Sequence, residues 1–187
     1  MEQTHFSQDE PARDPLVATL LITPAAQDYF DRLRQMHFPP ERNYLNAHLT
    51  LFHALPDEPW IMEDIIKLAQ DQPPFTVTAL QVVSLGFGTA FKIGAPELPA
   101  LHQTLQKHWS QYLTNQDRQK RNFHITVQNK VEPAAAKKLL AELSGSFEPF
   151  SFAVSGIRLW RYKGGPWEFL TTIPFQGSIP ATEQTEL

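Results

Sequence analysis

Short runs of apolar residues alternate along the chain with stretches in which apolar residues recur every three or four positions. The first pattern predicts β-strands and the second predicts amphipathic α-helices. Thr and Glu residues followed directly by Pro mark where several of the helices begin, since Pro suits the first helical turn. We expect strands at 16–22, around 48, and at 75–86, 88–94, 121–129, 147–163 and 166–175, with helices at 24–36, 58–70, 97–113 and 132–143.

The predicted elements occur in the same order twice. Each half contains a helix, a strand carrying His-x-Thr, a helix that starts with Glu-Pro, and a hairpin. The two His-x-Thr histidines are 76 residues apart and the two Glu-Pro pairs are 74 residues apart. The repeat units span about 24–94 and 97–175, too few copies for a solenoid. We therefore predict one α+β domain over 15–176, built as two lobes related by a pseudo-two-fold axis, with flexible tails at 1–14 and 177–187.

Composition narrows the classes of partner and chemistry. The 187 residues are 42% hydrophobic and 19% charged, with a formal net charge of -4, which is typical of a soluble globular protein and does not favour wrapping duplex DNA. The absence of cysteine excludes disulfides, thiolate nucleophiles and Cys-based metal sites. The polar, acidic N-terminal stretch is unlike a signal peptide, and no apolar run is long enough to span a membrane. We expect a cytoplasmic monomer.

The residues that carry chemistry are the paired segments "HLTL", starting at His48, and "HITV", starting at His124. Side chains alternate between the faces of a strand, so each histidine shares a face with the threonine two positions later, Thr50 or Thr126. If the lobes face each other, two imidazoles and two hydroxyls converge on one cleft. The pair is a much stronger signal than either triplet alone.

Two histidines and two hydroxyls suit phosphodiester chemistry through a 2′,3′-cyclic phosphate. A neutral imidazole can take a proton from water or a ribose hydroxyl, while the opposite imidazolium gives one to the leaving oxygen. The threonine hydroxyls can donate hydrogen bonds to the non-bridging phosphate oxygens. This chemistry requires no cofactor. A metal bound by the two histidines is an alternative, but no third potential ligand lies at a sequence spacing typical of metal-binding motifs.

The doubled motif resembles that of the 2H phosphoesterases, and more narrowly the branch called 2′-5′ RNA ligase or RNA 2′,3′-cyclic phosphodiesterase. The resemblance covers about residues 15–175. It implies two antiparallel sheets facing a central cleft, with helices outside. It also implies catalysis by His48 and His124 and phosphate binding by Thr50 and Thr126, on small nucleotides or RNA ends with cyclic phosphates. Two alternatives stay open: 2′-5′ RNA ligation at the same site, and non-catalytic binding of nucleotides or RNA ends.

Further residues are candidates for substrate contact. Tyr44 and Asn46 share the strand face of the first motif histidine, and Asn122 shares that of the second, although each could instead cap the entry to its strand. On the last hairpin, Arg161 could hold a phosphate and Trp167 could stack on a base, unless they belong to a solvated turn and to the core. The basic run 117–121 could guide an anionic substrate or be a solvated loop. His53 is expected to face away from the cleft, because a regular strand gives it the parity of Leu49 and Leu51.

Overall fold

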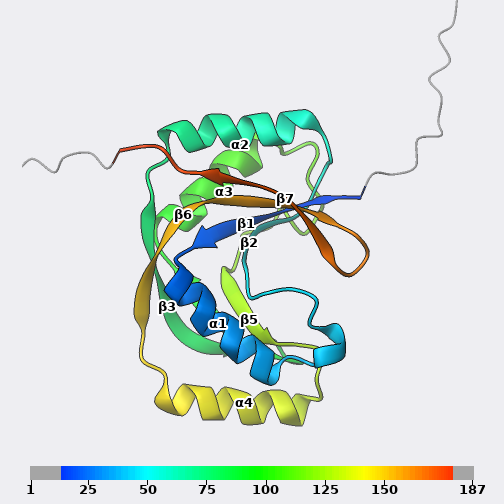
Figure 1. The fold of residues 1–187 in the computed structure, drawn as a ribbon, viewed down its shortest axis with the longest axis vertical. Coiled ribbons are helices and arrows are strands. Elements are labelled where there is room, and N and C mark those ends of the chain that lie inside the picture. Colours follow the sequence, from blue (N-terminus) through cyan, green and yellow to red (C-terminus); the bar gives the residue numbers. More distant parts are fainter. Residues whose placement is uncertain (1–13, 179–187) are drawn as a thin grey trace, which may run out of the picture.

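The computed structural model describes residues 14–178, which form seven strands, four α-helices and a short 3-10 helix (Figure 1). The predicted tails therefore lie outside the described residues, except for Asp14, Gly177 and Ser178. The elements are β1 (Leu16–Ile22), α1 (Pro24–His37), η1 (Pro40–Arg42), β2 (Leu49–Leu55), α2 (Pro59–Asp71), β3 (Phe75–Ser84), β4 (Thr89–Gly94), α3 (Glu97–His108), β5 (His124–Gln128), α4 (Pro133–Ser146), β6 (Phe150–Tyr162) and β7 (Trp167–Pro174).

Most of the predicted elements are present. Helices α1, α2 and α4 each begin with proline, as predicted, because the first turn of a helix needs no N–H from that residue. Both hairpins turn at a glycine with a φ of 80°, Gly86 and Gly164, a conformation that favours glycine over other residues. The helix expected at 97–113 ends early, at His108, where the buried Trp109 leaves the helical conformation and donates to Asp64 through its indole N–H (2.9 Å).

The strands form one antiparallel sheet, in the order β1-β2-β5-β4-β3-β6-β7, and a further pairing of β1 with β6 closes it on itself. The prediction of two antiparallel sheets is therefore wrong in this respect. The reason is β6, whose 13 residues are long enough to pair first with β3 and then with β1. On the opposite side, the motif strands β2 and β5 meet through the single pair Leu49–Ile125. The pseudo-two-fold relation of the lobes stays a prediction.

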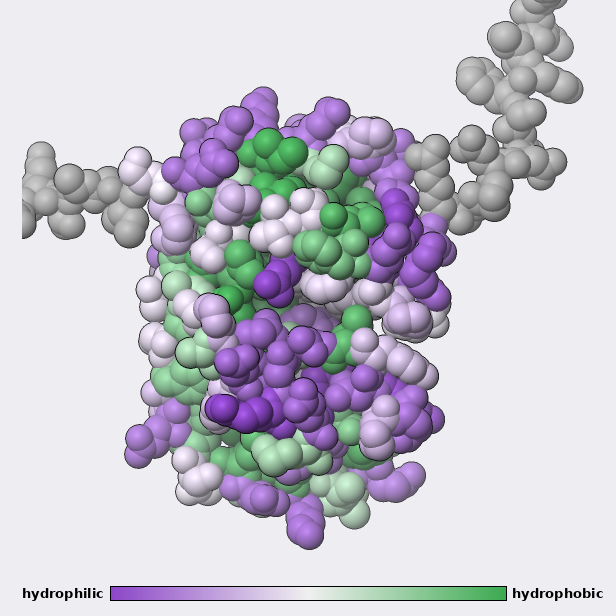
Figure 2. All heavy atoms as spheres, viewed as in Figure 1, coloured by the Kyte–Doolittle hydropathy of each residue, from purple (hydrophilic) through white to green (hydrophobic). Residues whose placement is uncertain are grey.

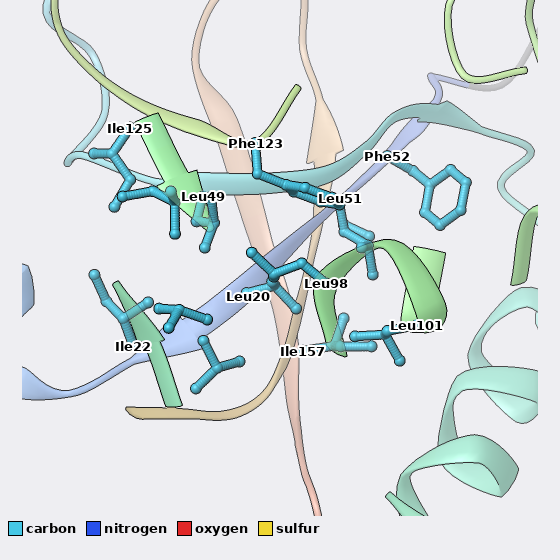
Figure 3. Packing of buried hydrophobic residues seen from close by; sticks show 14 of the residues in the cluster. Leu20, Ile22, Leu49, Leu51, Phe52, Leu98, Leu101, Phe123, Ile125 and Ile157 are labelled. Carbon is cyan, nitrogen blue, oxygen red and sulfur yellow. The ribbon is translucent and has the colours of Figure 1, made fainter. Parts of the chain in front are cut away.

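The helices cover the outside of this closed sheet. Helices α2 and α3 lie at one end of the molecule and α4 at the other, with α1 beside β5 (Figure 1). The apolar faces of the motif strands point into the core, as expected: Leu49, Leu51 and Ile125 are fully buried (Figure 3). Burying these side chains fixes which faces of β2 and β5 remain for polar residues.

Hydrophilic residues gather over the region of α1 on the face seen in Figure 2, and hydrophobic residues show there as separate patches. Within residues 14–178, no helix combines the length and the apolar character that crossing a membrane requires.

Candidate active site

The two motif histidines are held in the same way. Nδ1 of His48 donates a hydrogen bond to the main-chain carbonyl of Asn46 (2.8 Å), and Nδ1 of His124 donates one to the carbonyl of Asn122 (2.8 Å). A carbonyl can only accept, so Nδ1 carries the proton in both rings. This leaves Nε2 of each neutral imidazole with a free lone pair, able to take a proton from a reacting group.

Both histidines line one cavity of about 200 Å³. Thr50 and Thr126 line it as well, so the fold brings together the four motif residues predicted to form the site. The complete lining consists of His48, Thr50, His53, Leu85, Arg121, His124, Thr126, Asn129 and Trp167. A larger groove of about 550 Å³, between α2 and α3, is lined by none of these residues, and we assign it no chemistry.

Two arginines, the buried Arg34 and the largely buried Arg121, fix the backbone behind the motif threonines. The Arg121 Nε donates to the carbonyl of Thr50 (3.3 Å), and the Arg34 Nη1 donates to the carbonyl of Thr126 (3.0 Å). Arg34 also donates through Nε to Asn43 and to the carbonyl of Leu45, each at 2.9 Å. It thereby ties the loop that leads into the first motif to the strand of the second.

A second cavity, of about 260 Å³, adjoins the first and shares His48 and Trp167 with it. The centres of these two rings are 4.7 Å apart. Trp160 also lines this cavity and is oriented by its indole N–H, which donates to the hydroxyl of Thr19 (2.9 Å). Arg158 adds a cation. Two indoles and a guanidinium beside a histidine form a surface on which a planar, electron-rich ring can stack.

The other candidate residues have different positions. Tyr44 and Asn46 line the second cavity, and Trp167 lines both. Asn122 lines neither of these two cavities, and its carbonyl orients His124. Arg161 lies outside both as well, because β6 and β7 place it opposite Glu168, and it pairs with that residue (3.1 Å) and with Asp57 (3.0 Å).

His53 lies in the first cavity, so the prediction that it faces away is wrong. Thr50 pairs with Thr19 but Phe52 pairs with Ala18, which leaves one extra residue in β2. This β-bulge puts Leu51 and Phe52 both in the core and reverses the alternation beyond them. A matching shift in β5, where Val127 and Gln128 are both buried, brings Asn129 into the same cavity.

The sequence reasoning missed several residues that line the two cavities. Arg121 belongs to the basic run 117–121, which the sequence suggested could guide an anionic substrate. Its position three residues before the second motif histidine could have singled it out within that run. Asn129 stands five residues after that histidine, as His53 does after the first, and a bulge is what makes this spacing meaningful. Arg158 and Trp160 carry no comparable signal within the long strand β6.

The electrostatic setting keeps both motif histidines neutral. Burial lowers the pKa of His48 to about 4, against the opposing effect of the Asn46 carbonyl, and the charges of Arg34, His53 and His124 act in the same direction as burial. Burial also lowers the pKa of His124, with Arg121 contributing and the Asn122 carbonyl opposing. A bound phosphate, being negatively charged, would raise both pKa values and allow one ring to hold a proton.

A fully buried carboxylate, Asp117, supports the far side of the cavity. It accepts hydrogen bonds from the main-chain N–H groups of His53 (2.9 and 3.1 Å) and Ala54 (2.9 Å). Burial opposes its ionisation, but the side chain of His53, 3.5 Å away, and the main-chain N–H groups of His53 and Ala54 together outweigh burial, so the pKa of Asp117 lies below its ordinary value. Within residues 14–178, no group of three or more His, Asp or Glu side chains is arranged to hold a metal ion.

Other proteins of known structure share this fold. The chain is similar over most of its length to TT0787 of Thermus thermophilus, with 15% identity and a TM-score of 0.62, covering 88% of this chain and 100% of that one. It is also similar to E. coli LigT complexed with 3′-AMP, with 19% identity and a TM-score of 0.57, covering 87% and 98%. These likenesses establish a common fold.

No curated protein matched the sequence. The profile of the 2′-5′ RNA ligase superfamily, however, matches residues 22–166, a span that includes both histidine motifs and most of the strands and helices. The resemblance seen in the sequence is thereby confirmed, and the chain belongs to the 2′-5′ RNA ligase superfamily, the 2H phosphoesterases.

Proposed function

We propose that the protein is a phosphoesterase that opens 2′,3′-cyclic phosphates on RNA ends or small nucleotides by general acid–base catalysis with two histidines. One observation carries the proposal: both Nδ1 atoms are bound to carbonyls, so both rings keep a free Nε2, and both line one cavity with Thr50 and Thr126. Two such imidazoles can serve as base and acid in one step without a metal.

The proposed step is the attack of water on the phosphorus atom. The neutral ring of one motif histidine takes a proton from the water as the new P–O bond forms. The protonated ring of the other gives its proton to the ribose oxygen as the old P–O bond breaks. The products are a phosphomonoester on one ribose hydroxyl and a free hydroxyl on the other. Thr50 and Thr126 donate hydrogen bonds to the non-bridging oxygens, on which negative charge increases in the transition state.

The second cavity is proposed to bind the nucleoside. It begins at the catalytic pair, since His48 and Trp167 line both cavities, and its indoles and Arg158 provide a stacking surface for a base. Structures of E. coli LigT complexed with 3′-AMP, NADP+ and ATP support a site for small nucleotides in a protein of this fold. A mononucleotide is therefore a sufficient substrate for the first assay.

The test is turnover of 2′,3′-cyclic AMP and of an RNA oligonucleotide ending in a cyclic phosphate, in the presence of EDTA, with the isomeric products separated by chromatography. We expect opening of the ring in both substrates. A parallel reaction with a 5′-hydroxyl RNA reports on ligation at the same site, in which the 5′-hydroxyl attacks the phosphorus atom in place of water. Tight binding of both substrates without any product would instead identify a binding protein and contradict the proposal.

A further inference from the structure

Arg121 reaches the first cavity from the segment before β5, and the chemistry proposed above gives its side chain no role. The side chain is 9% exposed, and its Nε is committed to the carbonyl of Thr50 (3.3 Å). The two remaining nitrogens face the ring of His53. Nη1 lies 2.7 Å from the imidazole Nδ1, and Nη2 lies 3.0 Å from Nε2.

An imidazole cannot satisfy both of these donors. A neutral ring has one nitrogen that accepts and one that donates, and a protonated ring has two donors. At least one of the guanidinium N–H groups therefore faces a nitrogen that cannot accept its hydrogen bond. Two parallel N–H donors match two oxygens of a phosphate much better. His53 thus occupies the place in front of Arg121 that an oxyanion fits.

The buried carboxylate nearby forms an ion pair with Arg121 but accepts no hydrogen bond from this donor pair. Asp117 uses its oxygens for the main-chain N–H groups of His53 and Ala54, and its closest approach to the Arg121 Nη1 is 3.6 Å, beyond hydrogen-bonding distance. These bonds also hold the backbone of His53 in place, while its side chain is 36% exposed. The Nδ1 of this imidazole also lies 3.5 Å from the Asp117 Oδ1, so turning the ring away from Arg121 gives up that contact too but does not require the strand to move.

We propose that Arg121 is the phosphate-binding cation of this site and that the imidazole of His53 covers its guanidinium until an oxyanion displaces it. The bulge in β2 is what places His53 in front of Arg121, and Asn129 lines the same cavity from β5. The proposal rests on the proposed function only in taking the bound phosphate to be that of the reacting substrate.

Binding of inorganic phosphate tests the proposal without any turnover, by titration calorimetry on the full chain. Arg121→Gln removes the charge and the paired donors, and we expect it to weaken phosphate binding by about ten- to hundredfold, as loss of charge-assisted hydrogen bonds does. Arg121→Lys keeps the charge without the paired donors and should weaken it less. His53→Ala should strengthen binding by about three- to tenfold, because no imidazole has to be displaced.

The matched control is Arg118→Gln, in the same basic run. Arg118 is exposed, and its guanidinium donates to the carbonyls of Ser110 and Gln111, away from the cavity, so phosphate binding should not change. The double variant His53→Ala with Arg121→Gln should bind as weakly as Arg121→Gln alone. Thermal melting of each variant shows whether it is folded, and Arg121→Lys replaces Arg121→Gln if the latter is not.

Three results would overturn the proposal: a wild-type chain that does not bind phosphate, folded Arg121 variants that bind it like the wild type, or a His53→Ala variant that binds it more weakly. The last would make His53 a phosphate ligand rather than a cover. Failure of the proposed function is distinguishable, because it would be seen as absence of cyclic-phosphate opening by a chain that still binds phosphate through Arg121.

Discussion

His53 and Asn129 occupy corresponding positions, each five residues after a motif histidine and each turned into the same cavity by a bulge in its strand. The two strands therefore match in more than the His-x-Thr triplet. Each contributes a histidine, a threonine and a third polar side chain to the cavity, and the third is where they differ. This difference gives the two sides of an otherwise similar site different chemistry.

The motif histidines should be the most sensitive positions for catalysis. We expect His48→Ala and His124→Ala each to lower kcat for 2′,3′-cyclic AMP by about 10²- to 10⁴-fold, the usual contribution of a general acid or base. His108→Ala is the control, since that ring is 64% exposed and pairs with Asp64 between α2 and α3. Near-normal turnover by either motif variant would exclude the two-histidine mechanism.

The Trp167 side chain should affect substrate binding more than the chemical step. Its ring contacts His48 and lines both cavities, so Trp167→Ala should raise KM for a cyclic nucleotide by about tenfold, as loss of one stacked base does. Tyr112→Ala, at an exposed ring that packs on Trp60 elsewhere, should leave KM unchanged. Steady-state kinetics gives KM for the wild type and for both variants. A KM of Trp167→Ala equal to that of the wild type would show that Trp167 does not bind the nucleoside.

The pH dependence of kcat/KM should peak below the ordinary histidine pKa. Catalysis needs one neutral and one protonated ring, and the free-enzyme pKa values govern kcat/KM. Activity should fall on the acid side as pH approaches about 4, the pKa of His48, and on the basic side above the lowered pKa of His124. The kcat optimum should lie at higher pH, because bound phosphate raises both pKa values. A kcat/KM optimum above pH 7 would contradict this account.

His102 should make the fold sensitive to acid. Its ring is buried against Phe52, Nε2 has no hydrogen-bond partner, and burial lowers its pKa to about 4, with the charge of Arg121 adding to the effect. The unfolded chain, with a histidine pKa near 6.5, binds a proton more readily. The stability that the neutral ring provides is therefore complete above pH 6.5 and decreases as pH falls toward 4, by about 2 kcal/mol at pH 5.

The measurement is urea unfolding of the wild type and of His102→Leu at pH 8 and pH 5. We expect the variant to lose less stability than the wild type between these two pH values. An equal loss in both proteins would show that other groups cause the acid sensitivity.

The sequence predicted most of the elements and the four motif residues because these depend on local signals. The Glu-Pro pairs at 58–59 and 132–133 each stand directly before an apolar helical pattern, and His48 and Thr50 share a face over two residues of any strand. The errors arose where the outcome depends on pairing with distant strands. A bulge is defined by the neighbouring strand, so the parity of His53 could not be derived from "HLTLFH" alone.

The closure of the sheet could not be predicted for the same reason. Nothing in the run 147–163 shows that one half of it pairs with β3 and the other half with β1. Arg34 and Arg158 were missed for a related reason: an arginine on a predicted helix or strand is exposed by default, and only the fold shows that Arg34 is buried between the loop before β2 and the strand β5.

The shared strand β6 also constrains the order in which the protein becomes complete during synthesis. Until residues 150–162 have emerged from the ribosome, β1 and β3 each have an unpaired edge, and the sheet cannot close. Both motif histidines will by then have emerged on an open sheet, within reach of chaperones. The two motif strands can pair with each other before then, but the second cavity lacks Arg158 and Trp160 until β6 is in place, and truncation before β6 should yield an aggregation-prone chain.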